Sequence, residues 1–303
     1  LGGGHHPIRR RSLARMTRVA ADWLALRESF DAVARNEHLT RQLAPFALEH
    51  DEPLSVLDLG SGTGANFRYL APRLPCDQSW MLVDIDHLLL QSVEGETEQW
   101  AHRQGWTVER EGDATLFRCG RRRWAVECHH LDLMRELDKI DFRRFRLVTA
   151  SALADLIGPA WFDDLAQRCH DAGAAVAVTL TYDGRRVWAP RDPDDEVIVE
   201  WFNRHQQRDA GFGPAMGPRA GEYMARRLRN IGYRVLTERS DWHIMPEHMA
   251  MHHTLIEDAA RPCRELVPWE SGRIEAWAER RRWLVEEGSC QLTVGHVDLL
   301  ALP

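Results

Sequence analysis

The chain has 303 residues, 44% of them hydrophobic, with a formal net charge of -7 and a pI near 6.1. This length allows one large domain or two small ones. The acidic balance argues against a general nucleic-acid binder, and no apolar run approaches the 18 residues of a membrane span.

Six scattered cysteines without a C-x-x-C pair fit neither a disulfide framework nor a zinc site. They indicate free, buried thiols in a reducing cytoplasm, where we expect the protein to act. We do not interpret His5 and His6 as metal ligands. Adjacent pairs such as His129-His130 diverge on a strand or helix and cannot chelate alone, so we predict no metal.

Residues 1–50 are expected to form a helical leader before the main domain, 51–303. Apolar residues recur at helical steps in its first part: Trp23, Leu26, Phe30 and Val33. A second helix is expected around 38–50, with a kink at Pro45.

Residues 54–66 read as a buried strand, a tight glycine turn and a helix start. The turn has Gly60, Gly62 and Gly64 at alternate positions. Glycine is required where the backbone takes positive φ or approaches a ligand closely. The N–H groups that begin the next helix face an electron-rich partner. This stretch therefore predicts a cofactor-binding turn.

Three acids follow three successive strand candidates: Asp58 in 54–59, Asp84 after 80–83, and Asp132 after 124–129. In parallel sheets such side chains meet at one edge, where ligands bind. Asp84 and Asp132 are also consistent with ordinary helix caps, because aspartate is favoured there.

Two cofactor classes use such a turn. Gly60, Gly62 and Ala65 satisfy the dinucleotide fingerprint literally. Asp58, two residues before the first glycine, is unusual for that fingerprint. The string Asp58-Leu59-Gly60-Ser61-Gly62-Thr63-Gly64 closely resembles motif I of class I S-adenosylmethionine (SAM)-dependent methyltransferases.

That resemblance implies SAM as the cofactor. It implies that the glycine turn packs on the methionine part, that Asp58 helps hold the ammonium, and that Asp84 accepts from the ribose hydroxyls. Asp132 would accept from the adenine amino group. Arg27 or Arg35 would meet the SAM carboxylate, and Ser151, after the fourth strand, would also lie at the ligand edge.

Further elements predict an α/β fold with helices on both faces of a mostly parallel, seven-stranded sheet. We expect a hairpin insertion at 105–123, strands at 145–150, 174–181 and 233–238, and helices at 159–171 and 223–230. The region 247–287 reads as helical, within an insertion at about 240–288. An antiparallel last strand at 292–300, inserted beside the sixth, would separate this sheet from dinucleotide-binding sheets.

The insertion 184–221 lies where family members place substrate-binding segments. It holds Trp188, Trp201, Phe202, Phe212 and His205, and it follows Tyr182. Apolar walls with few polar groups describe a small-molecule pocket. We name His205 as a candidate base, since histidine titrates near neutrality, and we expect His205 or Tyr182 near the accepting atom. The same side chains are equally consistent with packing of the insertion onto the sheet. Ser151 and Asp155 are further acceptor-side candidates.

The predicted function is SAM-dependent methyl transfer to a small-molecule acceptor, at an O, N, S or C atom. The sequence lacks an Asn/Asp-Pro-Pro-Tyr/Phe element after the fourth strand, which disfavours DNA amino-methylation. RNA or protein methylation, or a SAM-fold scaffold without turnover, remains the alternative. The sequence leaves the oligomeric state open.

Overall fold

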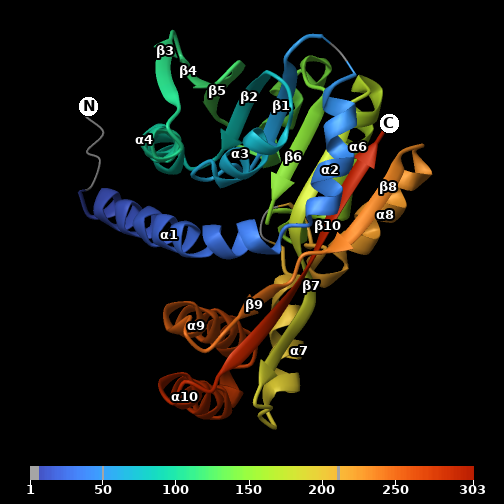
Figure 1. Cartoon of the computed structure of the whole chain (residues 1–303). Coiled ribbons are helices and arrows are strands. Elements are labelled where there is room, and N and C mark those ends of the chain that lie inside the picture. Colours follow the sequence, from blue (N-terminus) through green and yellow to red (C-terminus); the bar gives the residue numbers. More distant parts are fainter. Residues whose placement is uncertain (1–6, 50, 210–211) are drawn as a thin grey trace, which may run out of the picture.

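The computed structural model describes residues 7–49, 51–209 and 212–303 (Figure 1). His5 and His6 lie outside these residues. Within them, no helix is long and apolar enough to cross a membrane, and no three His, Cys, Asp or Glu side chains group as metal ligands. All six cysteines are free. Cys128 is exposed, so the expectation that the thiols are buried is wrong for that residue.

A single mixed sheet forms the centre of the molecule (Figure 1). Its strands are β1 (Leu54–Leu59), β2 (Gln78–Asp84), β3 (Thr107–Glu111), β4 (Ala114–Cys119), β5 (Arg122–His130), β6 (Leu147–Ser151), β7 (Ala175–Ala189), β8 (Arg234–Arg239), β9 (Trp242–Ile244) and β10 (Gln291–Leu302).

The strand order is β3-β4-β5-β2-β1-β6-β7-β10-β8, with β9 pairing to β10. β5, β2, β1, β6 and β7 run parallel, whereas β10 is antiparallel to both β7 and β8. The seven expected strands are all present. The sheet has ten strands rather than the seven expected. The additional strands are the hairpin β3–β4, which joins the sheet through β5, and β9, which joins it through β10.

Helices cover both faces of the sheet, and each face has its own apolar core. The α-helices are α1 (Pro7–Ala34), α2 (Glu37–Ala47), α3 (Ala65–Leu70), α4 (His87–Arg103), α5 (Leu133–Glu136), α6 (Pro159–Ala172), α7 (Asp195–Gln206), α8 (Ala220–Asn230), α9 (Met249–Leu266) and α10 (Ser271–Glu286). The 3-10 helices are η1 (Ala71–Arg73), η2 (Leu137–Lys139), η3 (Phe142–Arg144), η4 (Ala154–Leu156), η5 (Gly217–Arg219) and η6 (Pro268–Glu270).

A helical lobe, made of α7, α9, α10, β9 and the adjoining ends of β7 and β10, extends below the sheet (Figure 1). The prediction that the fifth strand ends near Thr181 is wrong, because β7 continues to Ala189. Its added part pairs with the first half of β10, for example Trp188 with Leu292. The first part of the insertion expected at 184–221 and the insertion expected at 240–288 thus pack around one shared apolar core. Phe212, Met216 and Ala220 of the first insertion belong instead to a core on the face of the sheet.

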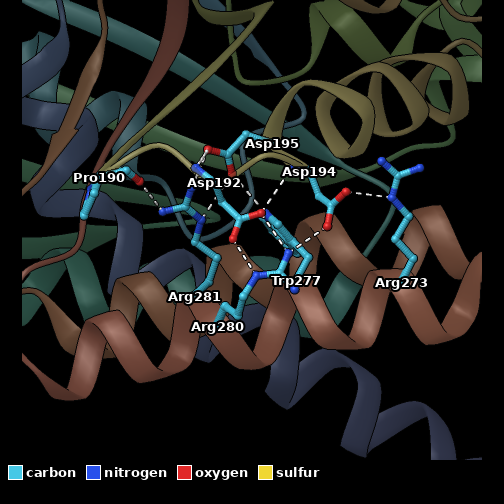
Figure 2. Close-up of polar contacts among 8 residues, drawn as sticks. All are labelled: Pro190, Asp192, Asp194, Asp195, Arg273, Trp277, Arg280 and Arg281. Atoms are coloured by element: carbon cyan, nitrogen blue, oxygen red, sulfur yellow. Dashed lines mark hydrogen bonds and ion pairs between the residues drawn. The ribbon is translucent and has the colours of Figure 1, made fainter.

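A polar network joins α10 to the loop before α7 (Figure 2). Arg280 binds Asp192 and Asp194, and Arg273 binds Asp194. Arg281, which is fully buried, forms an ion pair with Asp195 and donates to the carbonyl of Pro190 at 2.7 Å. This network fixes the far end of the helical lobe.

Helix α1 lies between the sheet and the helical lobe (Figure 1). Trp23, Leu26 and Phe30 pack on the lobe's core, as their spacing predicts. Val33 does not share that face, because its side chain is 87% exposed. Asn36 caps α2 through its side chain, and its N–H donates to Asp298 on β10 at 2.8 Å. This contact fixes the junction of α1 and α2 on the sheet.

Candidate functional site

The glycine turn joins β1 to α3 in a left-handed conformation. Gly60 and Gly62 have φ values of 66° and 53°, which side chains with a Cβ rarely adopt. A Cβ at position 62 would also lie 3.1 Å from the side chain of Leu24 on α1. The turn therefore requires glycine for its conformation and for the close approach of α1.

A pocket of about 280 Å³ lies against this turn. α1 forms one wall, and the turn and the carboxyl ends of β2 and β6 form the other. The lining residues are Trp23, Leu24, Arg27, Asp31, Arg35, Gly60, Ser61, Gly62, Thr63, Ala65, Asn66, Asp84, Leu89, Ser151 and Ala152. Five of the eight predicted cofactor residues line this pocket: Arg27, Gly60, Gly62, Asp84 and Ser151. Gly64 follows directly after the lining residue Thr63, whereas Asp58 and Asp132 do not line the pocket.

Asp84 connects the turn to the end of β2. Its Oδ2 accepts from the N–H of Gly62 at 2.8 Å, and its Oδ1 accepts from the N–H of Asp86 at 2.9 Å. A carboxylate oxygen has room for about two donors. Asp84 therefore keeps acceptor capacity toward the pocket while its orientation is fixed by backbone donors.

A buried chain of hydrogen bonds runs from Arg35, the residue directly after α1, to β1. Arg35 donates through Nη2 to Ser151 Oγ at 2.8 Å and through Nη1 to Asn66 Oδ1. Asn66 Nδ2 donates in turn to Asp58 Oδ1 at 2.7 Å and to Thr149 Oγ1 at 3.1 Å. Arg35 is thus connected to Asp58 through one amide side chain.

Three buried polar atoms beside the turn have no hydrogen-bond partner among the described residues: Arg35 Nε, Asp58 Oδ2 and Ser61 Oγ. Burial raises the pKa of Asp58 to about 7, against the effects of the Asn66 hydrogen bond and of Arg35. Burial also lowers the pKa of Arg35. Unpaired buried polar groups cost free energy, so these atoms fit a ligand that brings both donors and acceptors.

The remaining predicted residues lie elsewhere. Asp132 caps α5, with Oδ1 accepting from the N–H of Met134 at 3.0 Å, so its helix-cap role is observed directly. Tyr182 donates its hydroxyl to Asn203 at 2.8 Å. His205 Nε2 lies 3.1 Å from Glu265 in the helical lobe. Neither Tyr182 nor His205 lines the pocket described above.

The aromatic residues of the insertion pack rather than line that pocket. Trp188 and Phe202 are buried in the core of the helical lobe, against which Trp201 also packs. Phe212 makes an edge-to-face contact with Trp161, at 5.3 Å between ring centroids. These contacts favour the packing alternative: Trp188 lies on the extended β7, Trp201 and Phe202 lie on α7, and Phe212 packs on α6.

Sequence reasoning missed the part played by Asn66, Trp23 and Leu24. Asn66 lies eight residues after Asp58, in the first turn of α3, where its amide reaches back to β1. Its position two residues after Gly64, the last glycine of the turn, was a usable signal. Trp23 and Leu24 line the pocket only because α1 crosses it, and nothing local in the sequence indicates that crossing.

The sheet defines the class of fold. Counted in chain order among the seven central strands, the last lies between the fifth and the sixth and is antiparallel to both. This is the class I SAM-dependent methyltransferase fold, and the resemblance in the glycine turn is confirmed at the level of architecture. The glycine turn occupies the expected position after the first strand.

No protein-family model and no curated protein matches the chain. Among solved structures, it is similar to a candidate methyltransferase from Bacillus halodurans, with 12% identity, a TM-score of 0.48 and coverage of 87% of this chain and 97% of that chain. A SAM-dependent methyltransferase from Thiobacillus denitrificans in complex with S-adenosyl-L-homocysteine has 14% identity, a TM-score of 0.41 and coverage of 89% and 93%. A cyclopropane synthase from Mycobacterium tuberculosis has 11% identity, a TM-score of 0.42 and coverage of 86% and 82%. The class therefore rests on the strand order and not on these likenesses.

Proposed function

We propose that the chain binds SAM beside the glycine turn and transfers its methyl group to a small-molecule acceptor. The observation that carries this proposal is the set of unpaired buried atoms around the turn: Arg35 Nε, Asp58 Oδ2 and Ser61 Oγ. SAM carries a carboxylate, an ammonium and ribose hydroxyls, which complement a cation, a carboxylate and a hydroxyl.

We assign the cofactor roles by asking which charged side chains of the pocket already have a partner of opposite charge. Arg27 lines the pocket but forms an ion pair with Asp31 at 2.9 Å. Arg35 forms no ion pair with the residues that the structure describes. We therefore assign the SAM carboxylate to Arg35 rather than to Arg27. Asp58 is assigned to the ammonium and Asp84 to the ribose hydroxyls. Asp132, next to the same edge, remains the candidate for the adenine amino group.

SAM supplies a methyl group on a sulfonium, which is already a strong electrophile. The chain's own contribution is to hold the reactants in line and to exclude water. α1 serves the second purpose, because four of its residues form one wall of the pocket, together with Arg35 directly after the helix: Trp23, Leu24, Arg27 and Asp31. Tyr182 and His205 are already bonded to Asn203 and Glu265. We assign them a positioning role on the acceptor side.

A small organic acceptor is supported by the net charge of -7, which would not steer polyanions to the protein. Calorimetry should detect SAM binding and no NAD binding; the reverse result would reject the cofactor assignment. Radiolabelled SAM should then label a metabolite fraction. Label found only in RNA or protein would show that the acceptor is a macromolecule rather than a small molecule. SAM binding without any methyl transfer would favour a scaffold protein without turnover.

The loop 211–221 offers a separate test of the acceptor side. Of its described part, the N–H of Met216 donates to the carbonyl of Ile157 at 2.9 Å, next to η4. We expect deletion of 211–221 to abolish methyl transfer and to leave SAM affinity within a few-fold. Loss of SAM binding with folding intact by circular dichroism would place the loop over the cofactor.

A further inference from the structure

A second buried carboxyl group lies just beyond the pocket, in η4. Ser151 and Ala152, at the end of β6, line the pocket. Ala152 has a φ of 53°, and its N–H donates to the carbonyl of Thr179 on β7 at 3.0 Å. Asp155 follows three residues later and is 8% exposed. The loop that forms part of the pocket wall thus holds this carboxyl group at the same edge of the sheet.

Polar groups of α1 and β7 act on Asp155. Arg27 of α1, which also lines the pocket, and the backbone N–H of Tyr182 on β7 both favour its charged form. Burial outweighs them and raises the pKa of Asp155 to about 6. His296 on β10 contacts the ring of Tyr182, with 6.3 Å between ring centroids, and its buried Nδ1 has no partner in the part of the chain that the structure describes.

The nearby acids are committed to other contacts, whereas Asp155 forms no ion pair within the described ranges. Asp31 pairs with Arg27 and accepts from Trp242. Asp183 and Asp241 both pair with Arg185. The helices η5 and α8 also pack against η4. Their charged residues, among them Arg219 and Glu222, form no ion pair with Asp155.

We propose, resting on the proposed function, that Asp155 is the general base for an acceptor that reacts through a hydroxyl or amino group. The O–H or N–H bond of the acceptor breaks, and its proton goes to the Asp155 carboxylate. The acceptor atom bonds to the methyl carbon, and the electron pair of the carbon–sulfur bond stays on sulfur.

The other titratable groups nearby are poorer bases. Burial raises the pKa of Tyr182 to about 12, so its phenol stays protonated at neutral pH. Burial and the charges of Arg27 and Arg186 lower the pKa of His296 to about 3, so this imidazole binds a proton weakly. A carboxylate that titrates near pH 6 is ionised at neutral pH and still retains basicity.

The activity test compares Asp155→Asn with the wild type, using radiolabelled SAM and a panel of phenols, alcohols and amines. We expect the transfer rate to fall by about 10²–10⁴-fold, which is typical for loss of a general base. SAM affinity measured by calorimetry should stay within about threefold, as expected for a residue outside the cofactor contacts. Asp155→Glu should restore part of the rate. Asp164→Asn, on the outer face of α6, is the control and should match the wild type.

A second readout needs no acceptor. Carbon-13 NMR of aspartate carboxyl groups should show one transition near pH 6 that is missing from Asp155→Asn. Titration of Asp155 in the ordinary range near pH 4 would overturn the proposal, as would unchanged transfer by Asp155→Asn. A wild-type protein that binds no SAM would instead reject the proposed function, so the two failures are distinguishable.

Discussion

Two buried arginines divide this molecule into a structural region and a candidate ligand-binding region. Arg281 of the helical lobe is fully buried, and its guanidinium binds both oxygens of Asp195 (Figure 2). Arg35 of the pocket is 5% exposed, but its partners are the neutral Asn66 and Ser151. Buried charges are normally paired. The difference indicates that the charge of Arg281 serves the fold and that of Arg35 serves an anionic ligand.

The largest expected effect lies in the helical lobe. Asp195→Ala leaves the charge of Arg281 buried without a counter-ion, so the free energy of unfolding should fall by about 3–5 kcal/mol. Urea denaturation followed by tryptophan fluorescence measures this loss. Asp194→Ala, whose partners Arg273 and Arg280 are both about half exposed, is the control. An equal loss in both variants would contradict the inference that the buried ion pair of Arg281 stabilises the fold more than the exposed ion pairs of Asp194 do.

At Arg35 the expected effect is on the cofactor rather than on folding. Arg35→Met should weaken SAM binding by about 1.5–3 kcal/mol, the usual contribution of a hydrogen bond to a charged group. Isothermal titration calorimetry measures the change. Arg27→Met is the matched control and should have less effect, because Asp31 already neutralises that arginine. If Arg27→Met proves the more damaging variant, the carboxylate belongs to Arg27.

Asp84 tests the ribose side of the same pocket. Asp84→Ala should weaken SAM binding by about 1–3 kcal/mol, since it leaves ligand hydroxyls and the N–H of Gly62 unpaired. Competition with S-adenosylhomocysteine would report the same loss. Unchanged affinity for both ligands would place the ribose away from β2.

Asp58 gives the smallest expected effect, which depends on pH. Its pKa near 7 means that the free protein holds this carboxyl protonated below that pH. An ammonium ligand needs the carboxylate, so SAM affinity should be lost as pH falls, by about tenfold from pH 8 to pH 6. Calorimetry in buffers of different ionisation enthalpy should detect the proton released. Asp58→Asn should remove most of this dependence; an unchanged dependence would assign it to another group.

Local patterns were sufficient for the parallel part of the sheet. The apolar runs at 54–59 and 80–84 and the glycine turn between strand and helix predict a buried strand and a turn wherever they occur. The same patterns failed at the second half of β7, which pairs with the antiparallel β10. Residues 182–189 carry polar and charged side chains, and they form a strand because β10 is long enough to pair with them.

The sequence by itself determined the glycine turn, with its positive φ values, and Asp84 beside it, because a tight turn and a strand end depend on neighbouring residues. Only the tertiary structure decided which arginine lacks a counter-ion and which acids are already paired. Arg27 and Arg35 are the same residue type and lie eight residues apart, the first in α1 and the second directly after it. Asp31 reaches the first, whereas Asn66 and Ser151, distant in sequence, reach the second. Burial and pairing of a charge depend on such distant segments, which local spacing does not encode.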